Sequence, residues 1–244
     1  MKTFIVIPLV LTTVLLFSLW MILDPARESG NLSIAEVQPT VSPLPQANDN
    51  VNRTTSQPYT GDLSIFEEPE RENNLQINRV MDLLKITTGK TVADIGAGSG
   101  WFTVRAAKRV GETGQVYAVE INQEYIKHID ERAKTEKLAN ITTVLGKFDN
   151  PLLAKSSVDS VLILKTYHEI AEPIRFLKNL RPSLRGDALV GIIDRNGNGD
   201  DHGISKEMVV QEAKLAGFSL KEQFDFVKAD GMDYFLVFAY KNSD

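Results

Sequence analysis

A carboxylate and several glycines lie close together between residues 92 and 101. The apolar residues before Asp94 predict a short buried strand, and the residues from Trp101 onward predict a helix. Glycines between a strand and a helix allow a tight turn and let a ligand approach a backbone that carries no Cβ. The loop residues that we expect to contact this ligand are Asp94, Gly96, Ala97, Gly98 and Gly100.

The spacing and charge of the loop indicate which ligand it holds. Trp101 stands where a dinucleotide-binding loop, G-x-G-x-x-G, has its third glycine. The Asp94 carboxylate would repel a pyrophosphate and attract a cationic amino-acid group. The alternative is that Asp94 only caps the loop by accepting hydrogen bonds from backbone N–H groups. The whole pattern favours a ligand with a cationic amino-acid group.

Two more carboxylates follow the next two predicted strands. Glu120 ends the second strand, where a carboxylate can accept hydrogen bonds from both hydroxyls of a ribose. Asp149 follows the third strand and can accept a hydrogen bond from the exocyclic amine of adenine. Ile121 and Phe148 are expected to enclose the adenine ring. The alternatives are a solvated strand end for Glu120 and a turn residue for Asp149.

The segment after the fourth predicted strand holds the candidates for catalysis. His168 is the predicted general base, because an imidazole exchanges protons near neutral pH. Tyr167 and Glu169 are weaker catalytic candidates, and the alternative for His168 is a ring bonded only to backbone. The residues expected to line the substrate pocket are Lys165, Asp194 and His202.

A calcium-like pattern, D-x-[DN]-x-[DN]-G, begins at Asp194. Its twelfth position is Ser205 rather than Glu, and an apolar strand instead of a helix precedes it. The sequence therefore predicts no metal site here, but a turn after the fifth strand that borders the substrate pocket.

These residues need a framework of alternating strands and helices. Strands are predicted at residues 91–95, 116–119, 141–145, 160–164, 188–193, 218–227 and 234–240. Strands that alternate with helices indicate a parallel sheet covered on both faces. The last two strands are joined by Asp230-Gly231 without a helix, which predicts an antiparallel hairpin. The expected fold is α/β: a Rossmann-like, doubly wound, mostly parallel seven-stranded sheet with an antiparallel C-terminal hairpin.

Three zones follow one another along the chain. Residues 3–23 carry no charge and are long enough to cross a bilayer, so 1–23 is predicted to be a transmembrane anchor, with a cleaved signal sequence as the alternative. Lys2 favours an N-terminus in the cytoplasm and a domain in the periplasm, although the side stays open. Residues 24–62 are rich in proline and polar side chains and predict a disordered linker. Residues 63–244 form the predicted domain.

Composition narrows the classes of function. The 244 residues include no cysteine, which excludes a disulfide framework, a thiolate zinc site and a cysteine nucleophile. The net charge of −5 is opposite to that of a general nucleic-acid binder, so no nucleic-acid partner is expected.

Residues 67–240 resemble class I S-adenosylmethionine-dependent methyltransferases. Residues 94–100 match the first motif of that family, Glu120 its ribose-binding acid and Asp149 its adenine-side acid. The turn at residues 216–218 resembles the family's entry into its closing strands. The nearest likeness is to bacterial predicted methyltransferases with Tyr-His-His after the fourth strand, where this chain has Glu169 in place of the second histidine.

The resemblance implies S-adenosylmethionine as the cofactor and methyl transfer as the reaction. The expected acceptor is a small molecule or, because of the predicted anchor, a lipid-like molecule at the membrane. Two alternatives stay open, a binding module that has lost catalysis and a nicotinamide-dependent oxidoreductase. The missing third loop glycine argues against the second of these.

Overall fold

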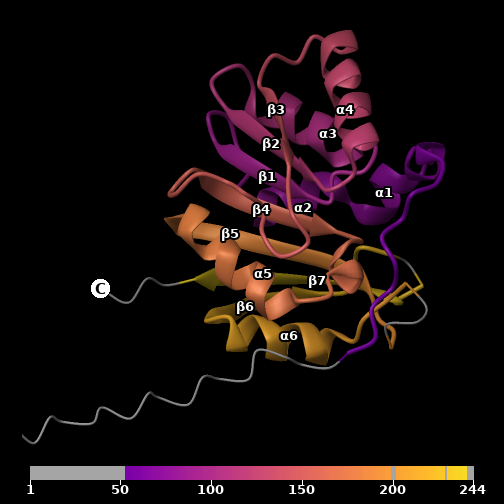
Figure 1. Ribbon diagram of the computed structural model, residues 1–244, viewed down its shortest axis with the longest axis vertical. Coiled ribbons are helices and arrows are strands. Elements are labelled where there is room, and N and C mark those ends of the chain that lie inside the picture. Colours follow the sequence, from indigo (N-terminus) through magenta and orange to yellow (C-terminus); the bar gives the residue numbers. More distant parts are fainter. Residues whose placement is uncertain (1–52, 199–201, 229, 241–244) are drawn as a thin grey trace, which may run out of the picture. The chain divides into compact units, whose positions relative to one another are not determined.

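The computed structural model describes residues 53–198, 202–228 and 230–240 (Figure 1). Its α-helices are α1 (Arg71–Leu75), α2 (Ile77–Leu83), α3 (Trp101–Val110), α4 (Gln123–Thr135), α5 (Pro173–Leu180) and α6 (Lys206–Leu215). Its strands are β1 (Thr91–Ile95), β2 (Gln115–Glu120), β3 (Ile141–Leu145), β4 (Val158–Leu164), β5 (Leu184–Arg195), β6 (Phe218–Phe224) and β7 (Asp233–Tyr240). Three short 3-10 helices are η1 (Leu63–Phe66), η2 (Tyr167–Glu169) and η3 (Arg181–Ser183).

All seven strands belong to one sheet in the order β3-β2-β1-β4-β5-β7-β6. The first five strands are parallel, whereas β7 pairs antiparallel with both β5 and β6 (Figure 1). The order reverses direction between β1 and β4, which is where sheets of this type bind ligands. The predicted mostly parallel sheet with an antiparallel C-terminal hairpin is confirmed.

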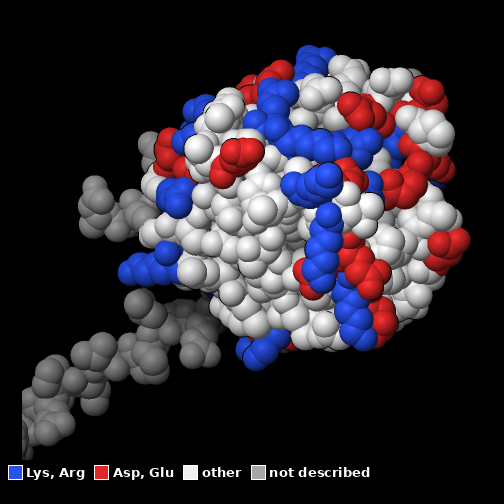
Figure 2. Space-filling view, turned by 90° about the horizontal axis from the view of Figure 1, so that it is seen from above, with Lys and Arg blue, Asp and Glu red and all other residues white. Residues whose placement is uncertain are grey.

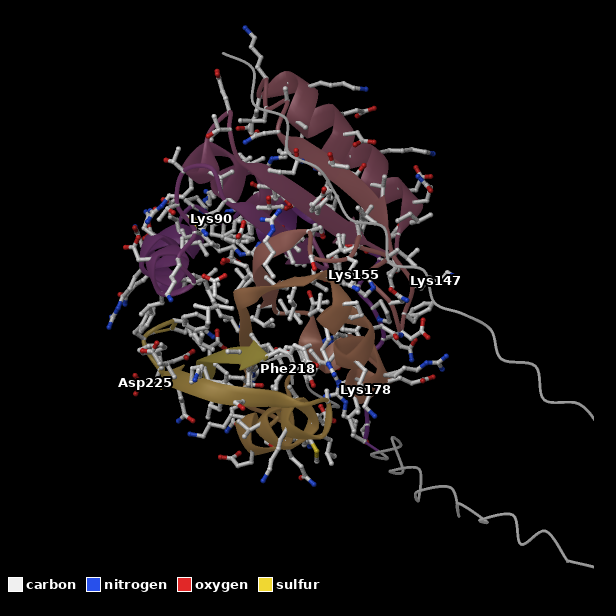
Figure 3. All side chains as sticks on the ribbon, turned by 90° about the vertical axis from the view of Figure 1, so that its left-hand side faces the viewer. Lys90, Lys147, Lys155, Lys178, Phe218 and Asp225 are labelled. Atoms are coloured by element: carbon white, nitrogen blue, oxygen red, sulfur yellow. The ribbon has the colours of Figure 1, made fainter. Side chains whose placement is uncertain are left out.

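Helices cover both faces because the central strands are apolar on both sides. In β1, Val92 packs with α2 and α3, whereas its neighbour Ala93 packs with α5 and α6 on the opposite face. The far helix α4 adds Ile129 against Ala118 of β2. Figure 3 shows side chains filling the space between these layers, with Phe218 in the interior and Lys147 at the surface.

The predicted closing strand at residues 218–227 is too long. Strand β6 ends at Phe224, after an irregularity in its pairing with β7 between Leu220 and Glu222. Val227 is fully buried, but it packs among residues of α2, α3 and β7 instead of extending the ladder. The buried side chain of Val227 therefore belongs to a turn that packs back against the core and not to a longer β6.

Residues 53–62, predicted to be the end of the linker, pack against the domain. We call them the N-terminal strap. Arg53 is buried at its start and donates hydrogen bonds to the carbonyl oxygens of Tyr167 (2.8 Å) and Ile170 (2.5 Å). Near its end, the carbonyl of Gly61 accepts a hydrogen bond from the Tyr125 hydroxyl at 2.9 Å. The strap thus bonds to segments on both sides of the β1–β4 switch point, and a domain boundary at residue 63 would divide it from its partners.

The predicted anchor at residues 1–23 and most of the predicted linker lie outside the described residues. Among the helices that the structure describes, none combines the length and the apolar composition needed to cross a bilayer.

Candidate functional site

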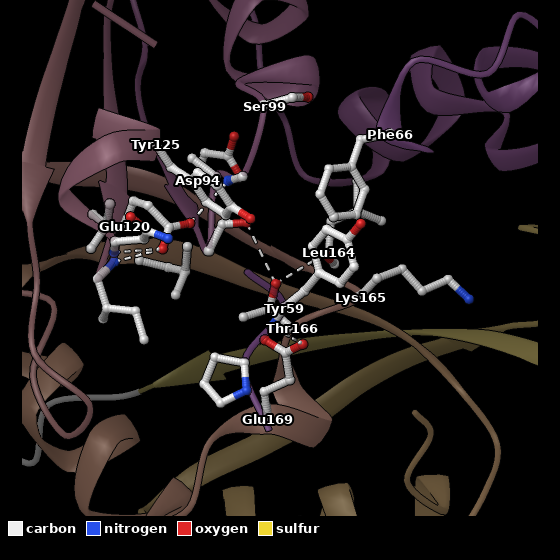
Figure 4. Close-up of a pocket in the computed structure, with 18 of the residues that line it drawn as sticks. Tyr59, Phe66, Asp94, Ser99, Glu120, Tyr125, Leu164, Lys165, Thr166 and Glu169 are labelled. Atoms are coloured by element: carbon white, nitrogen blue, oxygen red, sulfur yellow. Dashed lines mark hydrogen bonds between the residues drawn. The ribbon is translucent and has the colours of Figure 1, made fainter. Parts of the chain in front are cut away.

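A cavity of about 770 Å³ lies at the carboxyl ends of β1, β2 and β4, within the usual size range of small-molecule sites. The glycine loop after β1 forms one wall, and strap residues 57–60 lie along another. Figure 4 shows Asp94, Glu120, Tyr59 and Glu169 around this one space. Of the predicted site residues, the cavity is lined by Asp94, Gly96, Ala97, Gly98, Glu120, Ile121, Phe148, Lys165, His168, Glu169 and His202.

The glycine loop has the backbone conformation that its sequence predicts. Gly96, Gly98 and Gly100 all have positive φ angles, of 71°, 55° and 75°, which side chains with a Cβ adopt rarely. A Cβ on Gly96 would lie 2.3 Å from the side chain of Thr166, which follows β4. Gly96 therefore lets the loop after β1 approach the loop after β4. Gly100 caps α3 and does not line the cavity.

Asp94 is a buried carboxylate at the end of β1. Its Oδ2 accepts a 2.6 Å hydrogen bond from the Thr103 hydroxyl of α3. Burial raises the pKa of Asp94 to about 7, against the opposing effects of this hydrogen bond and of the Arg71 guanidinium. A cationic ligand group beside Asp94 would favour the ionised form, so the site matches the cationic ligand predicted from the sequence.

Glu120 ends β2 and organises the loop around it. Its Oε2 accepts a 3.0 Å hydrogen bond from the Gly98 amide, and its Oε1 accepts from the amides of Ile121 and Asn122 at 2.7 and 3.1 Å. Figure 4 marks these bonds with dashed lines. A carboxylate offers about four acceptor positions, so one position of Oε2 stays available to a ligand hydroxyl.

The predicted adenine contacts fall into two groups. Ile121 and Phe148 line the cavity and expose 37% and 68% of their surface, which leaves apolar area for a ring. Asp149 does not line it: its carboxylate pairs with Arg175 at 3.0 Å and its carbonyl accepts from Asn179, both on α5. The adenine role of Asp149 stays a prediction that this arrangement does not support.

His168 and Asp194 form a buried pair at the ends of β4 and β5. The His168 amide donates to Asp194 Oδ2 at 3.0 Å, and its ring Nδ1 lies 2.9 Å from Oδ1. Asp194 also accepts from the Arg195 amide at 2.8 Å and has no exposed surface. Because Nδ1 faces a carboxylate, the neutral ring carries its proton at Nδ1, and in that form Nε2 has a free lone pair. Asp194 thus acts behind His168 and not on the cavity wall.

Glu169 faces the same part of the cavity, beside the strap. Its Oε1 accepts a 3.2 Å hydrogen bond from the Tyr59 amide and lies 3.9 Å from His168 Nε2. Burial raises the pKa of Glu169 to about 7, although the charge of His168 and the Tyr59 amide oppose this effect. The strap therefore contributes directly to the environment of a predicted catalytic residue.

Tyr167 is not placed for catalysis. Its ring is fully buried in the core between the sheet and helices α5 and α6. Its hydroxyl donates to Glu212 Oε2 at 2.9 Å, and Arg53 of the strap pairs with the same oxygen at 3.5 Å. Successive side chains of η2 point in different directions, so only His168 and Glu169 reach the cavity.

The other predicted pocket residues differ in what they reach. Lys165 lines the cavity with its stem, but its ammonium pairs with the buried Asp233 and extends away from Glu169 (Figure 4). His202 approaches from the turn after β5, and its ring lies 5.8 Å from that of His168 at an angle of 89°. Sequence reasoning missed Tyr59 of the strap and Phe66 of η1, which line the cavity, because these segments show no hydrophobic periodicity.

Comparison with known proteins identifies a family whose sequence profile this chain matches. Residues 86–226 match the sequence profile of a family described as a methyltransferase domain. A protein-L-isoaspartate O-methyltransferase of Methanococcoides burtonii is 32% identical over 94 residues, which are 38% of this chain and 46% of that protein. A 2-phytyl-1,4-naphtoquinone methyltransferase of Trichormus variabilis is 28% identical over 107 residues, 43% of this chain and 47% of that protein.

Among solved structures, a methyltransferase from Aquifex aeolicus, described as SAM-dependent, superposes with a TM-score of 0.66. It is 23% identical, and the superposition covers 73% of this chain and 98% of that one. This likeness establishes the shared fold. The chain spans about half the length of the two relatives above.

Proposed function

The chain belongs to the methyltransferase domain family, and we propose that it transfers a methyl group from S-adenosylmethionine to a small-molecule or membrane-associated acceptor. S-adenosylmethionine is the cofactor that the family and its fold imply. The observation that carries the proposal is the cavity in which Asp94 and Glu120 lie on either side of a glycine loop. No phosphate-binding cradle is needed to account for these groups.

The residues of the cavity suit the parts of this cofactor. Asp94 would bind the cationic amino group, and that charge would offset the cost of burying the carboxylate. Glu120 has one free acceptor position for a ribose hydroxyl, and a second hydroxyl would have to displace a backbone amide. Ile121 and Phe148 would enclose the adenine.

The protein needs to contribute little covalent chemistry to methyl transfer. A lone pair of the acceptor attacks the methyl carbon in line, the S–CH3 bond breaks, and its electron pair stays on sulfur as S-adenosylhomocysteine. The protein supplies proximity and alignment. An acceptor hydroxyl or amine also loses a proton, and Nε2 of His168, held in place by Asp194, is positioned to accept it.

The strap beside the cavity favours a small-molecule acceptor over a macromolecule. Strap residues 57–60 lie over the cavity, which would restrict access by a folded protein or a nucleic acid duplex. On the face seen in Figure 2, basic side chains alternate with acidic ones around an uncharged area. The name of the naphtoquinone relative supports a lipid-like acceptor, which would suit the membrane anchor predicted for residues 1–23.

Calorimetric titration of the full chain tests the cofactor. We expect S-adenosylmethionine and S-adenosylhomocysteine to bind in the micromolar range and NAD not to bind. Asp94→Ala should weaken both sulfur ligands by roughly 10–100-fold, the range for a lost charged hydrogen bond. The exposed carboxylate of Asp187 offers a matched control, and Asp187→Ala should bind as the wild type does.

The outcomes separate the competing functions. Binding of NAD alone would overturn the methyltransferase assignment in favour of an oxidoreductase. Binding of both sulfur ligands, with no S-adenosylhomocysteine released across hydroxylated, amine and quinol acceptors, would favour a binding module that has lost catalysis. Loss of turnover in His168→Ala with unchanged cofactor affinity would support the proposed role of this histidine.

A further inference from the structure

Three side chains gather at one end of the cavity in a way that proton transfer does not explain. Ligand atoms of His168, Glu169 and His202 all lie within 4.8 Å of one another. They come from two elements, η2 after β4 and the turn after β5. A general base needs only His168 with Asp194 behind it, so Glu169 and His202 require another reason for their position.

The distances within this cluster suit a shared ion. His168 Nε2 and Glu169 Oε1 are 3.9 Å apart, which is too far for a hydrogen bond. Two donors that each lie about 2.0–2.2 Å from one metal ion are separated by roughly 3–4 Å. From separations of up to 4.8 Å, the cluster needs to contract by roughly 1–2 Å at most, and the exposed side chain of His202 has room to move.

The partner of His168 Nδ1 strengthens the argument. In metal sites, a histidine commonly donates its second ring N–H to a carboxylate, which fixes the tautomer and aims the other nitrogen at the ion. Asp194 stands in this position, 2.9 Å from Nδ1 and fully buried. His168 is thus oriented as a ligand before any ion arrives.

We propose that His168, Glu169 and His202 form a binding site for a divalent transition-metal ion at the acceptor end of the cavity. Two imidazoles with one carboxylate suit Zn²⁺, Fe²⁺, Co²⁺ or Ni²⁺ better than Mg²⁺ or Ca²⁺, because Mg²⁺ and Ca²⁺ prefer oxygen ligands to imidazole. Three protein ligands leave at least one coordination position open toward the cavity. Metal sites that bind substrate keep such an open coordination position, whereas purely structural metal sites do not.

The use of the ion in catalysis rests on the proposed methyl transfer, whereas its binding does not. An acceptor hydroxyl that binds the open position would have its pKa lowered, and its proton would pass to solvent. The resulting oxygen lone pair would form the bond to the methyl carbon as the S–CH3 bond breaks toward sulfur. In this arrangement Nε2 of His168 holds the ion, so the ion takes over the activation of the acceptor. The substrate class that follows is an oxygen nucleophile, such as a phenol or an enol.

The test uses the full chain without a histidine tag, freed of metal by a chelator and titrated with Zn²⁺ and Co²⁺. We expect one ion per chain with micromolar or tighter affinity, and a visible Co²⁺ absorption band of a site with four or five ligands. The chain contains three histidines, so His128, which lies on α4, offers the matched control. His128→Ala should bind as the wild type does.

The variants distinguish a built site from incidental binding. Asp194→Asn should weaken binding by roughly 10–100-fold, the usual effect of a supporting residue, and His202→Ala should weaken it further still. The side chain of His202 is exposed, so its loss leaves the core packing unchanged. Affinity that is millimolar, or that His202→Ala leaves unchanged, would overturn the metal site. Cofactor titration of the same samples is independent of this result, so a failure of the metal site and a failure of the proposed function are told apart.

Discussion

The cofactor side and the acceptor side of the cavity are built in different ways. The cofactor side comes mainly from one continuous stretch, residues 94–121, in which a strand, a loop, a helix and a second strand follow one another, and Phe148 after β3 completes it. The acceptor side combines η2, the turn after β5 and the N-terminal strap, which lie far apart in the sequence. Local chain geometry thus determines where the cofactor groups lie, whereas tertiary packing determines where the acceptor groups lie.

Two buried aspartates show what this difference means for chemistry. Asp94 has the neutral hydroxyl of Thr103 as its partner, and burial raises its pKa to about 7. Asp194 accepts from two backbone amides and the ring of His168. The Asp94 carboxylate is therefore available to bind a cationic ligand group, whereas the Asp194 carboxylate already positions His168. The cofactor side therefore binds through its own carboxylate, and the acceptor side acts through a group that a carboxylate holds.

The largest expected effect concerns the strap, which bonds to η2 on the acceptor side through Arg53. Arg53→Met should lower the free energy of unfolding by about 3–5 kcal/mol, because it leaves the buried Glu212 without its cation. Urea denaturation of the full chain measures this change. The double variant with Glu212→Gln should recover part of the loss, since it removes the unpaired charge. A loss below about 0.5 kcal/mol would show that the strap does not stabilise the fold.

Asp94 provides the next test, with an effect that depends on pH. The pKa of Asp94 in the folded protein, about 7, lies above its ordinary value of 3.8, so the folded state binds the proton more tightly than the unfolded state. The stability of the wild type should therefore fall as pH rises from about 4 to 7 through this group. Asp94→Asn removes the effect and should be the more stable protein at pH 8, by up to about 4 kcal/mol.

The matched variant on the other side should have the opposite sign. Asp194→Asn places an amide among three donors and should destabilise the protein at every pH. Chemical denaturation of both variants between pH 5 and 8, without cofactor, measures the contrast. If Asp94→Asn were destabilising at pH 8, the carboxylate would be satisfied in the free protein and the two aspartates would not differ.

Gly96 joins the two sides and offers a smaller effect. Gly96→Ala should cost about 3 kcal/mol, because it adds a collision with Thr166 to the strain of a positive φ. Gly89 has a similar φ of 79° and its nearest contact to an added Cβ is 3.6 Å, so Gly89→Ala measures the strain alone, about 1 kcal/mol. Thermal unfolding of Gly96→Ala and Gly89→Ala measures the difference between their losses of stability. Equal losses would mean that Thr166 moves aside and that the loops are not in tight contact.

The same division explains what the sequence could predict. The mostly parallel sheet, the antiparallel hairpin and the glycine loop follow from local patterns of apolar residues and glycines, and the structure confirms them. Asp149 was predicted on the same basis, but its carboxylate pairs with Arg175 of α5, which lies 26 positions further along (175 − 149). No local pattern encodes such a pairing.

The acceptor side was only partly predictable for the same reason. His168, Glu169 and His202 are recognisable as reactive residue types, yet their proximity depends on how two loops meet. The strap has the composition of a linker, and a single arginine that becomes buried ties it to the core. A hydrophobic pattern carries no signal for a polar segment that is held by hydrogen bonds and one ion pair.

The smallest effect, at Tyr167, tests whether neighbours in η2 have separate roles. Tyr167→Phe should lower the free energy of unfolding by about 1.5 kcal/mol, because Glu212 loses a hydrogen-bond donor, and should leave methyl transfer unchanged. Tyr234 is a matched control, since its buried hydroxyl donates to the Ile204 carbonyl at 2.9 Å, and Tyr234→Phe should cost slightly less because that acceptor is neutral. Urea denaturation and turnover are measured on both variants. If Tyr167→Phe lost turnover with its fold intact, the Tyr167 hydroxyl would reach the acceptor. The conclusion that His168 acts on the acceptor and Tyr167 does not would then be wrong.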